Sequence, residues 1–158
     1  MRRLPAFIEA RKENWQRLRL GLKSIEEYVH FALPTHATKW NEDGSFEWDD
    51  SGCKTDCSWF GFKITLKENA PFTRTELCQH LDDEKIGNRM LFGGNMVRQP
   101  AFVQLKKDNP DAMRIIGDLP GADYIMHNTF FLGTYPGLSE SMIDRMANVI
   151  VKFVESKK

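Results

Sequence analysis

The chain has 158 residues, of which 41% are hydrophobic and 28% are charged. This length and composition predict one globular domain, or at most one and a part, and exclude a disordered or fibrous protein. Because its 22 basic residues balance its 22 acidic ones, the chain has no net charge, which argues against a dedicated nucleic-acid or polybasic membrane binder.

The first thirty residues are predicted to form one long helix. Apolar residues recur there at three- and four-residue spacings, as the buried stripe of an amphipathic helix requires. Pro5 suits the first helical turn, where its missing N–H group leaves no hydrogen bond unmade. Pro34 follows the pattern and marks its end. The stripe consists of Leu4, Phe7, Ile8, Trp15, Leu18, Leu22, Ile25 and Val29.

Residues 35–58 are predicted to be a loop, because turn-forming Asn, Asp, Gly and Ser are frequent in them. Residues 41–50 hold five acidic residues and no basic one. A connection of this length without regular structure is uncommon inside a compact domain. It therefore favours a functional loop or a mobile insertion.

A strand over residues 59–66 is the clearest β element, because apolar residues alternate along it. The alternating residues are Phe60, Phe62, Ile64 and Leu66. Thr73 and Glu76 then have the spacing of a capping box, which predicts a helix as far as about Glu84.

The next part of the chain mixes short elements with breaks. Residues 86–92 are predicted to form a second strand, which the glycine pair at 93–94 ends. Residues 95–110 are expected to be irregular, since they contain two prolines. A short helix is expected around residues 124–128.

The C-terminal part is predicted to hold a third strand, residues 129–133, and a last helix capped by Ser139. Strands are thus separated by helices, and none of the connections looks like a tight hairpin. This order predicts a small α/β or α+β fold, in which a three- to four-stranded sheet is packed with helices and a long helix leads in.

The chain carries few signs of export. No apolar run approaches the ~20 residues that span a bilayer, and the N-terminus lacks the apolar core of a secretory signal. An odd number of cysteines, three, favours free thiols and a cytoplasmic location.

One set of residues has the types of a metal site. Cys53, Cys57, Cys78 and His80 could in principle supply four zinc ligands. However, Cys78 falls on a predicted helix between apolar neighbours, where a thiol is usually a small buried apolar group. The sequence also lacks the common nucleophile and phosphate-loop motifs, so we expect no catalytic residue and no metal ligand in it.

The segment from Arg89 to Phe102 is the most informative for binding. It leaves a predicted strand and carries two arginines, two glycines and an asparagine. Guanidinium groups beside a flexible backbone are typical of an anion-binding edge. An ordinary surface loop remains the alternative on composition alone.

Four segments give the chain a resemblance to a known family. They are LPAFIEARKENW (4–15), SWFGFKITLKENAPFTRTEL (58–77), KIGNRMLFGGNMVRQPAF (85–102) and GDLPGADYIMHNTFFLGTYPGLSESMID (117–144). They resemble the C-terminal part of the DegT/DnrJ/StrS pyridoxal-phosphate sugar aminotransferases. Within that family they are similar to the branch of CDP-4-dehydro-6-deoxyglucose 3-dehydrases of lipopolysaccharide biosynthesis.

The resemblance implies the small domain of a fold-type I aminotransferase. Residues 1–33 would be its connecting helix and residues 34–158 the C-terminal small domain. The large domain of such enzymes, which holds pyridoxal phosphate and, in the dehydrase branch, an iron–sulfur cluster, is not among these residues. We therefore expect a fragment that binds no cofactor and is inactive alone.

The resemblance also implies a substrate side for this domain, facing a CDP-sugar in a homodimer. Arg89 or Arg98 would bind phosphate oxygens, and Asn95 would bond hydroxyl groups or the loop itself. The aromatic side chains proposed to lie against the sugar or the cofactor are Trp59, Phe60 and Phe92. The alternatives to this function are a free-standing interaction or dimerisation module, which would use the apolar stripe of the first helix, and a small zinc-binding protein.

Overall fold

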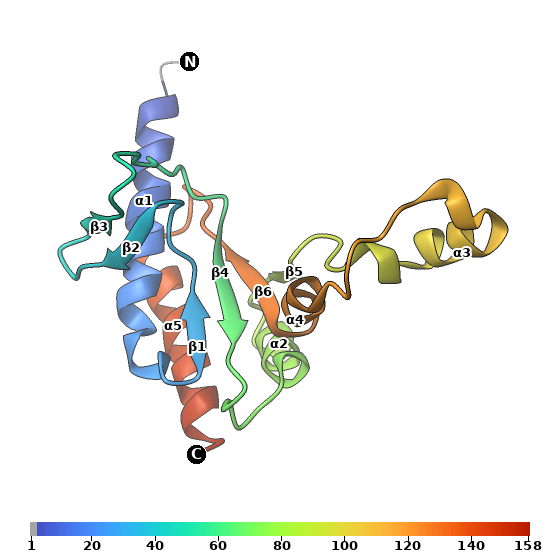
Figure 1. The fold of residues 1–158 in the computed structure, drawn as a ribbon. Coiled ribbons are helices and arrows are strands. Elements are labelled where there is room, and N and C mark those ends of the chain that lie inside the picture. Colours follow the sequence, from blue (N-terminus) through green and yellow to red (C-terminus); the bar gives the residue numbers. More distant parts are fainter. Residues whose placement is uncertain (1–2) are drawn as a thin grey trace.

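The computed structural model describes residues 3–158, in which helices and strands are mixed along the chain (Figure 1). The helices are α1 (Leu4–Gly21), α2 (Arg74–Asp83), α3 (Pro100–Asp108), α4 (Pro120–Asn128) and α5 (Glu140–Glu155). The strands are β1 (Val29–Phe31), β2 (Ala37–Trp40), β3 (Phe46–Trp48), β4 (Gly61–Leu66), β5 (Asn88–Met90) and β6 (Thr129–Gly133). Short 3-10 helices span Lys23–Ile25, Met96–Arg98 and Pro110–Ala112.

The main sheet has four strands in the order β1-β4-β6-β5, and all its neighbours are antiparallel. The expected mixed α/β architecture with a small sheet is therefore confirmed. The strand predicted at 129–133 has the predicted bounds. The strand predicted at 86–92 is shorter, because only Asn88–Met90 pair with β6.

The core lies between one face of this sheet and helices α1, α2 and α5 (Figure 1). Side chains of β4 and β6 on this face are fully buried, as are those of the facing helices. They include Phe62, Ile64, Phe130, Leu132, Leu18, Leu77, Leu81, Ile143 and Ile150. Where α1 ends, a Cβ on Gly21 would lie 2.7 Å from the Cβ of Ala147 on α5. Glycine at this position therefore permits the close approach of α1 and α5.

The N-terminal helix is shorter than the sequence predicted. α1 ends at Gly21, and the chain continues through a 3-10 turn into β1, which pairs with β4. Ile25 and Val29 continue the apolar spacing beyond Gly21, and both are buried. Ile25 lies in the 3-10 turn and Val29 in β1. The spacing thus identified buried residues correctly but not their backbone geometry. Residues 1–2 lie outside the described part, and the division at residue 33 stays a prediction.

The region predicted as a loop, residues 35–58, contains a hairpin formed by β2 and β3. Its turn uses Gly44, whose φ of +87° suits glycine, and Trp40 pairs with Phe46 across it. This hairpin contradicts the expectation that no connection is a tight hairpin. Its strands are three or four residues long and half-exposed, so they carry too little alternation to be recognised.

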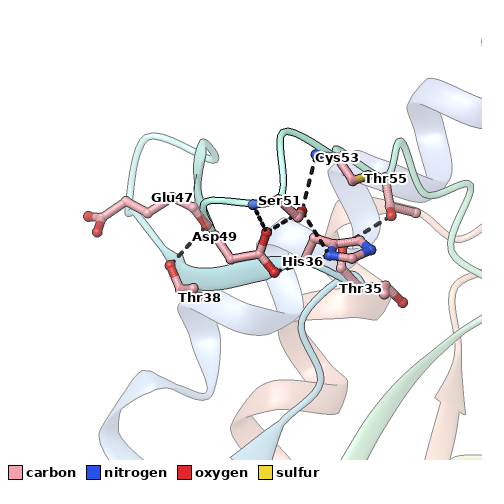
Figure 2. Close-up of polar contacts among 8 residues, drawn as sticks. All are labelled: Thr35, His36, Thr38, Glu47, Asp49, Ser51, Cys53 and Thr55. Carbon is pink, nitrogen blue, oxygen red and sulfur yellow. Dashed lines mark hydrogen bonds and ion pairs between the residues drawn. The ribbon is translucent and has the colours of Figure 1, made fainter.

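A polar network closes the base of this hairpin (Figure 2). Nδ1 of His36 lies 3.0 Å from a carboxylate oxygen of Asp49 and 3.1 Å from the hydroxyl of Ser51. The hydroxyl of Thr55 donates to the carbonyl of Thr35 at 3.0 Å. A catalytic triad needs its serine and its carboxylate on opposite nitrogens of the imidazole ring. Since both face Nδ1 here, we interpret the network as a structural closure of the hairpin.

Residues 95–110, predicted to be irregular, contain α3 and two 3-10 helices. Together with the irregular chain that returns to α4 they form a segment, residues 96–118, that projects from the rest of the molecule (Figure 1). We call it the projecting segment. None of the residues in α3 or in these two 3-10 helices is buried. The prediction failed because Pro100, read as a break, lies in the first turn of α3, where a proline is tolerated.

The capping box predicted for α2 is confirmed. The hydroxyl of Thr73 accepts from the backbone N–H of Glu76 at 3.2 Å, and the Glu76 carboxylate accepts from the Thr73 N–H at 2.7 Å. Lys157 at the end of the chain adds an ion pair to Glu76 at 3.0 Å. The Thr73 hydrogen bonds and Lys157 lower the pKa of Glu76 to about 2.

Replacing Thr73 with alanine is expected to lower the free energy of unfolding by about 1 kcal/mol, since an N-cap hydrogen bond is lost. Thr73→Ser keeps the hydroxyl and should keep most of that stability. Urea unfolding followed by circular dichroism measures both variants. The pKa of Glu76 is lower in the folded chain than the ~4.3 of a free glutamate. The ionised Glu76 therefore contributes its full share to the free energy of unfolding above about pH 4. This contribution should fade as the pH falls through about 2. Equal stability of Thr73→Ala and wild type at neutral pH would contradict this role of the cap.

Candidate functional site

The face of the main sheet opposite the core is only partly covered. Thr65 and Thr129, which are Cα partners, are buried where α4 packs on β4 and β6. Further along the strands, Lys63 and Arg89 both pair with Phe131, one from each side. Since cross-strand partners project to the same face, these three side chains form a row across the open part of the sheet. The lysine and the phenylalanine are half-exposed and the arginine is exposed.

Two further aromatic rings flank this row. The ring centroid of Phe60 lies 5.7 Å from that of Phe131, and the centroid of Phe92 lies 5.9 Å from it on another side. Phe60 is 67% exposed and Phe92 is 79% exposed. We call Phe60, Lys63, Arg89, Phe92 and Phe131 the open-face site. An aromatic cluster left in contact with solvent and bordered by two cations is typical of a binding surface.

Backbone geometry adapts to this cluster at two positions. A Cβ on Gly61 would lie 2.6 Å from the ring of Phe131, so glycine leaves the space that the ring occupies. Phe92 has a φ of +47°, in the left-handed region that bulky residues avoid. Its N–H donates to the carbonyl of Met90 at 2.8 Å and helps to hold this turn. Strained residues of this kind are frequent at functional sites.

Trp59 lies away from the open-face site. Its ring stacks on Trp15 of α1, with centroids 4.6 Å apart and planes 10° from parallel. Its carbonyl accepts from the hydroxyl of Thr134 at 2.7 Å and from Arg11 at 3.3 Å. The structure thus places Trp59 and its neighbour Phe60 in different surroundings.

Asn95 and Arg98 lie at the base of the projecting segment, where both bind Asp123 of α4. The amide of Asn95, which is 2% exposed, donates to Oδ1 of Asp123 at 2.7 Å. Nη2 of Arg98 donates to Oδ2 at 2.5 Å, and its Nε donates to Oδ1. These bonds lower the pKa of Asp123 to about 2, with Arg98 as the largest cause. We call the three residues the Asp123 clasp, because they attach the projecting segment to α4.

The sequence matches the profile of the DegT/DnrJ/EryC1/StrS aminotransferase family over residues 1–151. The chain belongs to this family.

Similar proteins narrow the comparison within the family. The chain is 39% identical over 155 residues to the lipopolysaccharide biosynthesis protein RfbH of Salmonella typhimurium, covering 98% of this chain and 30% of that protein. It is 36% identical over 152 residues to the dTDP-4-dehydro-2,6-dideoxy-D-glucose 3-dehydratase of Saccharopolyspora spinosa, covering 96% of this chain and 28% of that protein. The chain thus spans about 30% of the length of the curated relatives it matches.

A solved structure shares the fold. The GDP-4-keto-6-deoxy-D-mannose-3-dehydratase of E. coli, with bound hydrated pyridoxal phosphate, superimposes with a TM-score of 0.69 at 21% identity. The match covers 94% of this chain and 32% of that one. Among the residues that the structure describes in our chain, no helix combines the length and apolar character needed to cross a membrane.

Pyridoxal phosphate, which membership of this aminotransferase family implies, does not fit residues 3–158 as a complete site. Such sites hold the cofactor through a Schiff-base lysine and set a polar partner against the pyridine nitrogen. Within those residues no lysine side chain is buried. Lys12, one of the less exposed, forms ion pairs with Glu9 at 3.1 Å and with Asp56 at 2.7 Å. No step of the cofactor's chemistry is therefore assigned to this chain.

The zinc site considered as an alternative does not form in the described residues. No three His, Cys, Asp or Glu side chains gather there as metal ligands would. Cys53 is exposed, whereas Cys78 is buried and burial raises the pKa of its thiol to about 11. The four ligands of the zinc-binding alternative are therefore not gathered into a site in the described part of the chain.

Sequence reasoning missed two residues of the open-face site, Phe131 and Lys63. Both lie in strands that were predicted with nearly correct bounds. The missing step was the register, which places Lys63, Phe131 and Arg89 side by side. An unusual Phe-Phe pair in the predicted strand 129–133 was the available signal, since one ring faces the core and the other must face outward.

Proposed function

We propose that this chain forms the substrate-side small domain of a pyridoxal-phosphate-dependent enzyme that dehydrates or aminates a nucleotide-linked deoxysugar. Membership of the aminotransferase family supports the proposal, as do relatives named for 3-dehydration of such sugars. The single observation that carries the assignment of the site is the open face of the sheet. Its exposed aromatic rings and cations are unexplained by packing within residues 3–158.

The open-face site offers two kinds of interaction with a CDP-sugar. Arg89 and Lys63, on either side of Phe131, would attract the diphosphate, and the arginine can donate two parallel hydrogen bonds to it. Phe60, Phe92 and Phe131 would contact the base or the apolar face of the sugar. In this role the chain binds and orients the substrate and keeps water from one side of it.

The Asp123 clasp gives Arg98 and Asn95 a supporting part in the same proposal. Two nitrogens of the Arg98 guanidinium donate to Asp123, so the arginine attaches the projecting segment to α4. Its remaining N–H groups would bind a phosphate of the substrate. Asn95 is buried and would act on the substrate only through the loop that it anchors. Trp59, which stacks on Trp15 of α1, would line a part of the surface outside the open-face site.

The cofactor, in this proposal, is supplied by a large domain or another chain, together with the iron–sulfur cluster where the enzyme is of the dehydrase branch. The active form would be a homodimer in the cytoplasm, in keeping with three unpaired cysteines. The alternative of an interaction module retains less support. The chain's own core covers most of the α1 stripe, and Leu4 and Phe7 are the stripe residues that stay exposed.

Arg89→Gln tests the site. Because hydrogen bonds to charged groups contribute about 1.5–3 kcal/mol, the variant is expected to bind CDP-glucose about tenfold or more weakly than wild type. Arg114→Gln, which changes an exposed arginine on the projecting segment, should bind as wild type does. Titrations followed by amide chemical shifts measure both affinities and locate the ligand. We expect shifts around residues 60–63, 89–92 and 129–133.

Three results would contradict the proposal. The shifts could map elsewhere on the surface, or Arg89→Gln could bind CDP-glucose with unchanged affinity. Turnover of a CDP-sugar by the chain alone with added pyridoxal phosphate would also exclude a purely substrate-side role.

A further inference from the structure

A cavity of about 310 Å³ lies between α1 and the β2–β3 hairpin. α1 contributes one wall, and the hairpin together with the chain that leads from it into β4 forms the others. It shares none of its lining residues with the open-face site. Ligand pockets typically run from about 300 to 1,000 Å³. This cavity is therefore large enough for a single ring and too small for a dinucleotide.

Aromatic rings form much of its lining. Trp15, Phe46, Trp48 and Trp59 all border it. The Trp15 ring is buried and forms the floor, where it stacks on Trp59 and lies 5.9 Å from Phe46. Phe46, Trp48 and Trp59 are half-exposed, although large aromatic side chains gain most from full burial. The cavity thus presents apolar ring faces that the chain itself does not cover.

The polar lining includes both donors and acceptors of hydrogen bonds. It contains the ammonium group of Lys12, the amide of Gln16, the hydroxyl of Thr55 and the carboxylate of Asp56. The side chain of Gln16 extends from α1 to the hairpin, where its amide nitrogen lies 3.5 Å from the carbonyl oxygen of Gly44. A ligand with several hydroxyl groups, each able to donate and accept, can match such a mixed set.

The lining of the cavity holds two lysines and one carboxylate. Lys12 pairs with Asp56 at 2.7 Å and with Glu9 at 3.1 Å, so its charge is already neutralised. Lys54 is the other cation on the lining and is exposed to solvent. Glu9 lies outside the lining, so the charge of Lys12 is balanced by one carboxylate of the cavity and one beyond it. An anionic ligand such as a nucleotide would gain little here, because its phosphate would have to displace Asp56 from Lys12.

We propose that this cavity binds a neutral pyranose ring. One face of such a ring consists of C–H groups, which would lie against Trp48 and Trp59 on the electron-rich side of the indoles. The hydroxyls at its edge would bond Gln16, Thr55 and Asp56. The site is small and partly open, so the affinity is expected to be in the millimolar range.

Tryptophan fluorescence gives a direct test, since three of the four tryptophans line the cavity. The intact 158-residue chain is titrated with D-glucose, D-galactose, D-mannose and L-rhamnose, none of which absorbs with indole. At least one of these sugars should give a saturable change of emission. Glycerol, which has hydroxyls but no ring, and benzoate, which has a ring but no hydroxyls, should give none.

Two variants locate the site and one serves as a matched control. Trp48→Ala removes a ring face and should weaken binding at least tenfold, as measured by calorimetry because a fluorophore is lost. Asp56→Asn keeps every tryptophan and should weaken binding severalfold, so the test survives if Trp48→Ala disturbs the hairpin. Lys39→Ala changes a lysine on β2 that pairs with Glu47 and does not line the cavity. It should bind as wild type does.

The proposal is overturned if none of the four sugars gives a saturable response. It is also overturned if glycerol gives the same response, if benzoate alone binds, or if Asp56→Asn and Lys39→Ala bind a sugar equally well. Amide shifts distinguish this site from the open-face site, because sugar binding here should perturb residues 44–48 and 54–59 while leaving 89–92 unchanged.

Discussion

Replacing Trp15 with alanine is expected to lower the free energy of unfolding by about 3–5 kcal/mol, the range for large aromatic side chains removed from a core. Trp15 is 1% exposed and joins three parts of the molecule. Its ring stacks on Trp59 and lies 5.6 Å from Phe62 of β4. On the other side it lies 6.2 Å from Trp40 and 5.9 Å from Phe46 of the hairpin. One substitution therefore removes contacts between α1, the sheet and the hairpin.

Leu20→Ala is the matched control for Trp15→Ala. Leu20 lies on the same helix but is 46% exposed, so its loss should change the stability by no more than about 0.5 kcal/mol. Trp15→Phe should fall between the two, because a smaller ring still fills part of the space. Guanidinium unfolding followed by circular dichroism measures all three variants. A loss below about 1 kcal/mol for Trp15→Ala would show that the aromatic cluster is not the centre of the core.

Elements with strong local signals were predicted well from the sequence. The capping box of Thr73 and Glu76 fixed the start of α2, and Ser139 fixed that of α5. Strand 129–133 was predicted with its observed bounds. For the two helices the deciding interaction, the N-cap hydrogen bond, lies within a few residues of the chain, and for the strand the local signal is its β-forming residues. The physical information was therefore available without knowledge of the tertiary structure.

Elements that depend on distant contacts were predicted poorly. The spacing of Ile25 and Val29 suggested a helix, but pairing of β1 with β4 makes residues 29–31 a strand. The β2–β3 hairpin is stabilised where Trp40 and Phe46 pack on Trp15 of α1. An apolar residue at a given position signals burial, whereas the element that achieves the burial depends on its partner.

The residues of the candidate site were likewise predicted only in part. Phe60, Phe92 and Arg89 were chosen from the sequence, and the structure gathers them around Phe131, which was not chosen. Trp59 was proposed together with Phe60 from the family resemblance, and it packs on α1 instead. Adjacent residues of an extended segment point in opposite directions. Only the sheet register decides which of them shares a face with a third residue.

The projecting segment is attached to the rest of the molecule by few contacts. Its helix α3 buries no residue, so packing contributes little to its position. The Asp123 clasp is its main described attachment to α4, through Asn95 and Arg98. A segment that depends on so few contacts is expected to open locally without unfolding the core. Its orientation should therefore respond to Asp123 more than the rest of the fold does.

Asp123→Asn is accordingly expected to release the projecting segment. The amide cannot accept at both oxygen positions from Arg98 and Asn95. In either orientation of the amide its NH2 group faces an N–H of Arg98, and in one of them the side chain of Asn95, which is 2% exposed, also loses its acceptor. An unsatisfied buried group of this kind costs about 1–3 kcal/mol. Amide hydrogen exchange should accelerate about 5- to 150-fold at residues 96–118 and stay unchanged in β4 and β6. Asp118→Asn, an exposed position on the same segment, is the control and should exchange as wild type does.

The pH dependence of the same exchange gives an independent measurement of the clasp. The pKa of Asp123 is about 2 in the folded chain and about 3.9 in an unfolded one, so the released state binds more protons at low pH. The clasp should therefore be fully formed above about pH 4 and should weaken as the pH falls through about 2. Wild type should show this acid-induced opening at residues 96–118, whereas Asp123→Asn should not, because its amide does not titrate. Identical pH profiles for the two proteins would mean that something other than this carboxylate holds the segment to α4.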